Sequence, residues 1–172
     1  MNGSARRAGT PRGEDDDSGG EAPMNAADDW SPPATSRGGA PRFQDSYPAV
    51  PESVAAVRGA LHRFAQRSGV PRRTADAVAL AASEAATNVV VHAYREADAP
   101  GKIEIAAAVA ADELWVIVTD AGAGLRPRPD SPGLGLGLAI IAQIADGVDL
   151  VKPAAGGLEL RMRFALGEAA RS

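Results

Sequence analysis

The chain changes in composition near Arg42, and this limits where a folded core can form. Residues 1–42 contain seven glycines, five prolines and four serines, with seven acidic and five basic residues. A segment of this composition buries too little apolar surface to offset its conformational entropy, so we expect a disordered N-terminal extension. Residues 43–166 have the length of one ordinary domain, and residues 167–172 form a short tail. The central part must therefore supply the whole fold.

Residue counts exclude several kinds of site. The chain has no cysteine and only two histidines, so disulfide frameworks, thiolate nucleophiles and cysteine-ligated metals are excluded, and a histidine-rich metal site is disfavoured. The formal net charge of -4 argues against direct binding of nucleic acid through a broad basic surface. No run approaches the ~18 consecutive apolar residues of a membrane span, and the amino end lacks an apolar signal-peptide core. We therefore expect a cytoplasmic protein with no membrane segment.

The apolar pattern of the central part alternates between the periods of strands and helices, and prolines and glycines mark the boundaries. The predicted elements are a short edge strand within 43–50, a helix opened by Pro51 and ended by Gly69, a helix from about 71 or 74 to 94, strands at 102–110 and 114–119, a helix at 133–145, and strands at 148–152 and 158–165. This order predicts an α+β domain. We expect a two-layer sandwich in which helices cover one face of a mixed, mostly antiparallel sheet.

The first segment with chemical potential is SEAATNVVVHAY, residues 83–94, within the second predicted helix. Glu84 and Asn88 are four residues apart and so share one helical face. One amide oxygen is enough to anchor a magnesium-nucleotide, because Mg²⁺ takes its other ligands from phosphate and water. A carboxylate one turn earlier is suited to orient or deprotonate the group that attacks a phosphate. The alternative is that Glu84 caps or solvates the helix and Asn88 is an ordinary exposed residue.

The second segment is WVIVTDAGAGL, residues 115–125, in which an apolar strand leads Asp120 into a turn with Gly122 and Gly124. A carboxylate at this point can accept a hydrogen bond from the exocyclic amino group that adenine carries. The glycines allow the backbone to approach the edge of a base without a side-chain clash. The alternative is a strand followed by a common turn that begins at an aspartate.

The third segment has glycines at alternate positions, Gly133, Gly135 and Gly137, and continues directly into an apolar helix. Bare backbone at a helix N-terminus presents N–H groups to an anion, and the helix dipole adds a positive end, so phosphates bind there. The lysine and hydroxyl residue of a P-loop are absent. Residues 126–132 also separate the glycines from the preceding strand, unlike in a dinucleotide fingerprint. The alternative is a flexible glycine-rich turn.

Together the three segments resemble the N-box, G1 box and G2 box of the ATP-binding superfamily of gyrase, heat-shock chaperones, histidine kinases and MutL. SEAATNVVVHAY is similar to the N-box of the anti-sigma-factor serine kinases. The resemblance covers roughly residues 43–166. It implies ATP and Mg²⁺ as cofactors, with Asn88 as the metal ligand and Glu84 as the general base on a protein serine hydroxyl.

The resemblance also implies roles for the aspartate and the glycines. Asp120 would bind the adenine amino group, and Gly122 and Gly124 would shape the base pocket. The phosphate-proximal glycines would be Gly133, Gly135 and Gly137, beside a short lid at residues 126–132.

The implied function is that of an ATP-dependent serine protein kinase that acts as an anti-sigma regulatory factor. The implied partners are a sigma factor and an anti-sigma antagonist of the STAS type, which the kinase phosphorylates, and the implied assembly is a homodimer. Many superfamily members carry a Gly-Thr pair near the last strands, whereas here Gly156 and Gly157 are followed by Leu158. The alternative is thus a catalytically weak ATP-binding module whose nucleotide state controls partner binding. A sensor histidine kinase is disfavoured for lack of a dimerising phospho-acceptor region, and MutL-like or topoisomerase roles for lack of room for transducer domains.

Overall fold

The computed structural model describes residues 42–94, 99–122, 134–154 and 156–167. Apart from Arg42, the predicted disordered extension lies outside these residues, and so does the end of the predicted C-terminal tail. The elements, in chain order, are β1 (Arg42–Pro48), α1 (Pro51–Arg67), α2 (Arg72–Asn88), the π-helical turn η2 (Val89–Ala93), β2 (Lys102–Ala110), β3 (Glu113–Asp120), α3 (Leu134–Ile144), β4 (Gly147–Val151) and β5 (Leu158–Ala165). The predicted order of strands and helices is confirmed.

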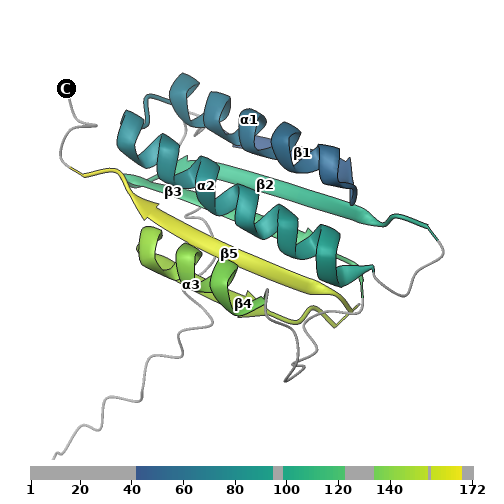
Figure 1. Cartoon of the computed structure of the whole chain (residues 1–172). Helices are drawn as coiled ribbons and strands as arrows, with labels where there is room; N and C mark the ends of the chain where they lie inside the picture. Colours follow the sequence, from purple (N-terminus) through teal and green to yellow (C-terminus); the bar gives the residue numbers. More distant parts are fainter. Residues whose placement is uncertain (1–41, 95–98, 123–133, 155, 168–172) are drawn as a thin grey trace, which may run out of the picture. The chain divides into compact units, whose positions relative to one another are not determined.

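The five strands that the structure describes form one sheet in the order β1-β2-β3-β5-β4 (Figure 1). Each of the four pairings between the described strands is antiparallel, so the parallel pairing expected of a mixed sheet is not found among them. The reason is the position of β5. Strands β3 and β4 run in the same direction, but β5 lies between them and pairs antiparallel with both. The α+β class is confirmed.

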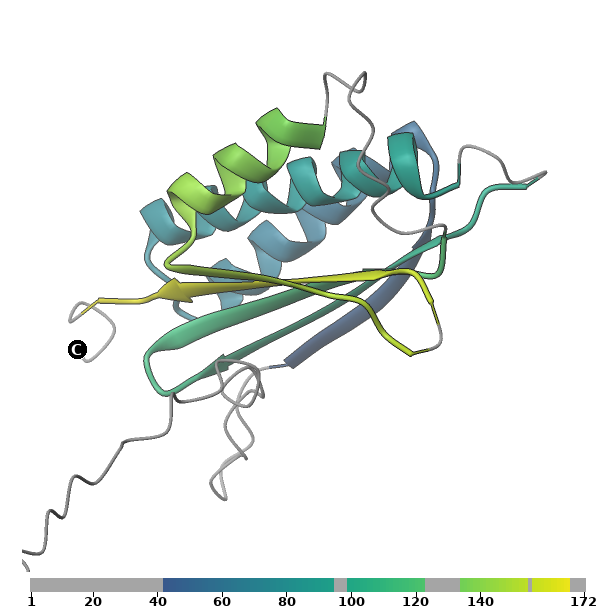
Figure 2. The ribbon, with the colours of Figure 1, turned by 90° about the horizontal axis from the view of Figure 1, so that it is seen from below.

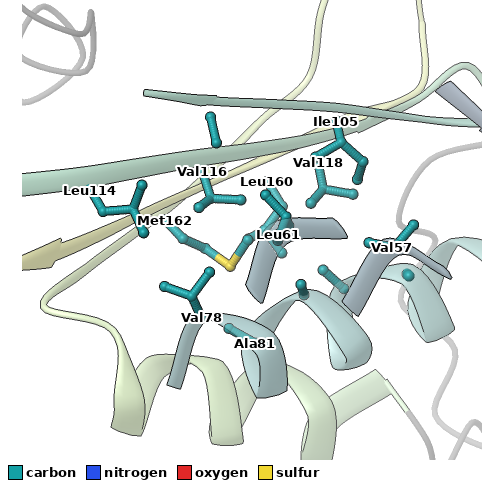
Figure 3. Packing of buried hydrophobic residues seen from close by; sticks show 14 of the residues in the cluster. Val57, Leu61, Val78, Ala81, Ile105, Leu114, Val116, Val118, Leu160 and Met162 are labelled. Carbon is teal, nitrogen blue, oxygen red and sulfur yellow. The ribbon is translucent and has the colours of Figure 1, made fainter. Parts of the chain in front are cut away.

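The three α-helices of the described residues lie on the same side of the sheet, which gives two layers (Figure 2). The core fills the space between the layers (Figure 3). Because side chains alternate along a strand, Leu114, Val116, Val118 and Asp120 of β3 all face the helices. Met162 of β5 pairs in register with Val116 and is fully buried. The strand that ends at Asp120 is thus anchored by the core, and its last residue opens onto the helical layer.

Helix α1 forms as predicted. Pro51 occupies its first turn, and Val57, Leu61 and Phe64 are buried along one stripe. The helix ends at Arg67, and Gly69 follows with a φ of 74°, a conformation that glycine adopts without strain. Of the helices that the structure describes, none has both the length and the apolar character needed to cross a membrane.

The hairpin between β2 and β3 is tighter than predicted. Glu113 was expected in the turn but belongs to β3 and pairs with Ala110. The turn consists of Ala111 and Asp112, which have φ values of 51° and 64°. Positive φ at both central residues is typical of the two-residue turns that match the twist of antiparallel strands.

Candidate functional site

Helix α2 carries the N-box residues and lies close to the sheet because its inner face is made mostly of alanine. Ala75, Ala81, Ala82 and Ala86 are fully buried in that face. Side chains this small let the helix backbone approach the strands. Helix α2 ends at Asn88, and the chain continues in η2, a wider π-helical turn. Such turns are rare and are frequent at functional sites.

The predicted metal ligand and the predicted base-binding residue line the same pocket. Asn88 comes from the end of α2 and Asp120 from the end of β3, and both side chains line one pocket. The other residues that line it are largely apolar: Ala85, Val89, His92, Ala93, Val118, Leu138, Leu150, Leu158 and Leu160. An apolar pocket with few polar groups suits a flat aromatic base. Two segments that the sequence analysis treated separately therefore meet around one cavity.

Asp120 is the buried acid of the pocket, with 5% of its surface exposed. Its Oδ1 accepts a hydrogen bond from the backbone N–H of Gly122 at 2.9 Å. Burial raises the pKa of the Asp120 carboxyl above its ordinary value, and the hydrogen bond from Gly122 offsets part of this. A buried carboxylate is costly unless it is hydrogen-bonded, so the pocket favours a ligand that donates to it.

Two glycines allow the backbone around Asp120 to pack closely. A Cβ atom on Gly122 would lie 2.1 Å from the carbonyl oxygen of Ala93, at the end of η2. Gly157, in the turn between β4 and β5, has a φ of 83°, and a Cβ there would lie 1.9 Å from the carbonyl oxygen of Asp120. Sequence reasoning treated Gly157 only as part of a missing phosphate contact. The structure places it against the base-binding turn.

Gly137 brings the third segment to the first. A Cβ atom on Gly137 would lie 3.0 Å from Oε2 of Glu84 and 3.4 Å from Oδ1 of Asn88. The side chains of Glu84 and Asn88 therefore face bare backbone in α3. Gly135 lies in the first turn of the same helix. Two predicted site residues, Gly124 and Gly133, and the predicted lid at 126–132 lie outside the described residues.

The donor set around Gly137 fits a metal that takes most of its ligands from elsewhere. Within the described ranges, no three histidine, aspartate or glutamate side chains come together to hold an ion. What the site offers is the amide oxygen of Asn88 with the Glu84 carboxylate beside it. Mg²⁺ in nucleotide sites is held in this way, by one or two protein oxygens together with phosphate and water.

Sequence reasoning missed most of the apolar wall of the pocket. Leu158 pairs in register with Asp120, and Leu150 pairs with Leu160. In the sequence these leucines are typical of ordinary strand residues. The alternation along a strand shows which face of the sheet a residue occupies, but it does not show which part of that face lines a pocket. The remaining signal is exposure: Leu150 is 41% exposed although it lines a pocket.

The family model of the histidine kinase-like ATPase domain matches residues 47–164. The chain belongs to this family. The match spans all three boxes, and it confirms the family resemblance and the fold class inferred from the sequence. Membership implies that the domain binds ATP.

Several curated relatives are named serine-protein kinase RsbW. The chain is 36% identical to the one from Bacillus licheniformis over 88 residues, which cover 51% of this chain and 54% of the relative. It is 43% identical to that of Bacillus subtilis (strain 168) over 75 residues, which cover 44% and 46%. For Bacillus cereus (strain AH187) the identity is 30% over 125 residues, 64% of this chain and 77% of the relative. The chain thus spans about half the length of the first two relatives.

Two solved structures have the same fold. The RsbU and RsbW domains of a protein from Mycobacterium tuberculosis align with a TM-score of 0.58 and 24% identity, covering 73% of this chain and 32% of that chain. The histidine kinase domain of the blue-light activated kinase from Erythrobacter litoralis EL346 aligns with a TM-score of 0.51 and 22% identity, covering 70% and 62%. At these identities the likeness supports the architecture of a two-layer ATPase domain.

Proposed function

We propose that this protein is an ATP-dependent serine protein kinase that acts as an anti-sigma regulatory factor, with residues 43–166 as its ATP-binding domain. The observation that carries the proposal is the position of Gly137 beside both Glu84 and Asn88, next to the pocket that Asn88 shares with Asp120. A nucleotide whose base lies at Asp120 would extend past Asn88 toward Gly137. Its terminal phosphate would then lie near a carboxylate.

Each residue has a definite task in this proposal. Asp120 accepts a hydrogen bond from the adenine amino group, while Gly122 and Gly124 shape the base pocket. Asn88 holds Mg²⁺ together with the phosphates, and the glycines at the start of α3 present backbone N–H groups to them. The metal supplies neutralisation of the phosphate charge. Gly133, Gly135 and Gly137 are the glycines on the phosphate side.

Glu84 would act as the general base that accepts the proton of the attacking serine hydroxyl. Its surroundings support an acceptor that arrives from outside. Glu84 is half-buried and lines an open groove between α1 and α2, together with Arg58, His62 and Leu80. Asp120, in contrast, is buried. A serine on the surface of another protein would reach Glu84 through this groove, at a distance from the buried Asp120.

The partners that we propose are an anti-sigma antagonist of the STAS type, which receives the phosphate, and a sigma factor, which the protein sequesters as a homodimer in the cytoplasm. The relatives support the serine acceptor, since they are named serine-protein kinases. The groove carries charges of both signs, because Arg58 is exposed in it and Asp76, which pairs with His62 at 2.9 Å across the two helices, lines it together with Glu84.

The alternative function is a catalytically weak ATP-binding module whose nucleotide state is read by a partner. Leu158 favours it, because it occupies the position after Gly157 where many members carry threonine, and it lines the pocket with an apolar side chain. Under this alternative ATP binds at the same residues, but no phosphate reaches serine.

The decisive experiment compares the wild type with Glu84→Gln, using labelled Mg-ATP and purified candidate antagonist proteins. We expect Glu84→Gln to reduce phosphate transfer to serine by about 100-fold or more, because it removes the general base. The ATP affinity measured by calorimetry should stay within about twofold, because the residue acts on the acceptor and not on the nucleotide. Glu104→Gln, on exposed β2, is the matched control and should leave transfer unchanged.

Three outcomes separate the proposals. Loss of transfer with ATP binding retained supports the kinase. ATP binding by the wild type without transfer to any candidate supports the regulatory module. An absence of ATP binding by the wild type contradicts both.

A further inference from the structure

Tyr94 connects three segments that are distant in sequence. Its side chain begins at the end of η2, and its hydroxyl donates a hydrogen bond to the carbonyl oxygen of Lys102 in β2 at 3.1 Å. The same hydroxyl accepts the backbone N–H of Ala121 at 3.0 Å. The hydroxyl therefore ties the turn after β3 to the end of the N-box helix and to the neighbouring strand.

The tyrosine ring is held in place by a glycine. A Cβ atom on Gly101 would lie 1.9 Å from two carbon atoms of the Tyr94 ring, so the ring packs directly against bare backbone there. Gly101 is the residue before β2, whose first residue, Lys102, accepts the hydroxyl hydrogen bond. The ring and the hydroxyl thus contact the same short stretch of chain, which fixes the direction of the side chain.

The turn that Tyr94 holds carries the base-recognition residue. Ala121 lies between Asp120 and Gly122, and the N–H of Gly122 bonds to the Asp120 carboxylate at 2.9 Å. Ala93, the residue before Tyr94, lies close to Gly122: a Cβ atom on Gly122 would lie 2.1 Å from the carbonyl oxygen of Ala93. Ala93 and Tyr94 thus contact two consecutive residues of the turn, Gly122 and Ala121.

We propose that Tyr94 is a positioning residue for nucleotide recognition, which sets the place of the Asp120 carboxylate relative to Asn88 by anchoring Ala121. The inference rests on the proposed nucleotide function and adds a determinant of base selectivity to it. Tyr94 does not line the pocket. It acts through the backbone of the turn, and recognition of a base by a carboxylate needs that backbone held to a fraction of an ångström.

The expected effect follows from removing one hydroxyl. Tyr94→Phe keeps the ring against Gly101 and loses both hydrogen bonds. Water can replace them, because both bonds lie at the surface, so the fold should persist. The affinity for Mg-ATP should fall by about three- to tenfold, the range that a net hydrogen bond corresponds to. The preference for ATP over GTP should fall by a similar factor, because the loosened carboxylate discriminates less between an amino group and a carbonyl.

The test is calorimetry with Mg-ATP and Mg-GTP on the full chain. Tyr47→Phe is the matched control, because it also removes a tyrosine hydroxyl hydrogen bond, to Asp45 at 2.7 Å on β1, away from the pocket. Gly101→Ala is the second variant, since it displaces the ring while keeping the hydroxyl. We expect Tyr94→Phe and Gly101→Ala to lower both the affinity for Mg-ATP and the preference for ATP over GTP. Hydrogen exchange at the Ala121 amide should be faster in both variants. Tyr47→Phe should behave as wild type.

Unchanged ATP affinity and unchanged selectivity in Tyr94→Phe would overturn the inference while leaving the nucleotide function intact. If that variant does not fold, wild-type values in a folded Gly101→Ala would overturn it. An equal loss in Tyr47→Phe would also overturn it, since the effect would then be general. No binding of Mg-ATP by the wild type would overturn the nucleotide function and this inference together.

Discussion

Replacing Asp120 by asparagine separates recognition of the base from stability of the fold. The substitution keeps an oxygen that can accept the hydrogen bond from the Gly122 N–H, which is 2.9 Å long in the wild type. It removes the negative charge, and it replaces the other carboxylate oxygen by an amide NH₂ group, which is a donor. The adenine amino group, also a donor, then loses its acceptor. A hydrogen bond to a charged group is worth roughly 1.5–3 kcal/mol, so we expect ATP to bind about 10- to 150-fold more weakly.

The Asp120→Asn substitution should not lower the free energy of unfolding at neutral pH, although it weakens ATP binding. Burial raises the pKa of Asp120, which means that the ionised form is less favourable in the folded chain than in the unfolded chain. The contribution of this group to stability is therefore fully present below the unfolded pKa and is lost as pH rises through the folded pKa. Asparagine carries no charge to bury. At neutral pH the Asp120→Asn variant should be at least as stable as the wild type, and this advantage should shrink as the pH is lowered.

Calorimetry with Mg-ATP and urea unfolding at neutral and acid pH would measure both effects. Glu104→Gln is the control, because Glu104 is an exposed carboxylate on β2. If the Asp120→Asn variant bound ATP as tightly as the wild type, Asp120 would not be the residue that recognises the base. If it were less stable than the wild type at neutral pH, the assigned cost of burying the carboxylate would be wrong.

Three further substitutions test other parts of the site and core. Gly122→Ala would place a Cβ 2.1 Å from the carbonyl oxygen of Ala93, so the turn must shift and calorimetry should show ATP binding weakened by about tenfold or more. Met162→Ala should lower the free energy of unfolding by about 2–5 kcal/mol, measured in urea, because its fully buried side chain leaves a cavity. Leu150→Ser should weaken ATP binding by about 1–2 kcal/mol and lower the free energy of unfolding by about 1–2 kcal/mol, because the side chain is 41% exposed; a loss of stability as large as that of Met162→Ala would contradict this.

The elements and the two polar groups of the pocket were predictable because they depend on local patterns. The spacing of Glu84 and Asn88 places them on one face, and the alternation Leu114, Val116, Val118 places Asp120 on the helix side of β3. Both patterns follow from the periods of helix and strand. The structure adds that the face of α2 with Glu84 and Asn88 lies against α3, because both side chains are close to Gly137.

Other features depend on packing between distant segments and could not be predicted from one sequence. The insertion of β5 between β3 and β4 decides that Leu158 lies next to Asp120. The π-helical turn η2 follows an alanine-rich helix without any local breaker, and it directs Ala93 toward Gly122. The departure from the superfamily's Gly-Thr pair lies at Leu158, and the sequence gives no reason for the preceding Gly157; only its closeness to the carbonyl oxygen of Asp120 shows what this glycine is for.

If a nucleotide binds in the pocket, the position of β4 predicts an effect on the stability of the sheet. This strand is five residues long, pairs only with β5 in the sheet that the structure describes, and supplies Leu150 to the pocket. Short peripheral strands open more readily than central ones. A base held between Leu150 and the central strands would stabilise the pairing of β4 with β5. We therefore expect that loss of ATP destabilises this edge strand before any other part of the domain.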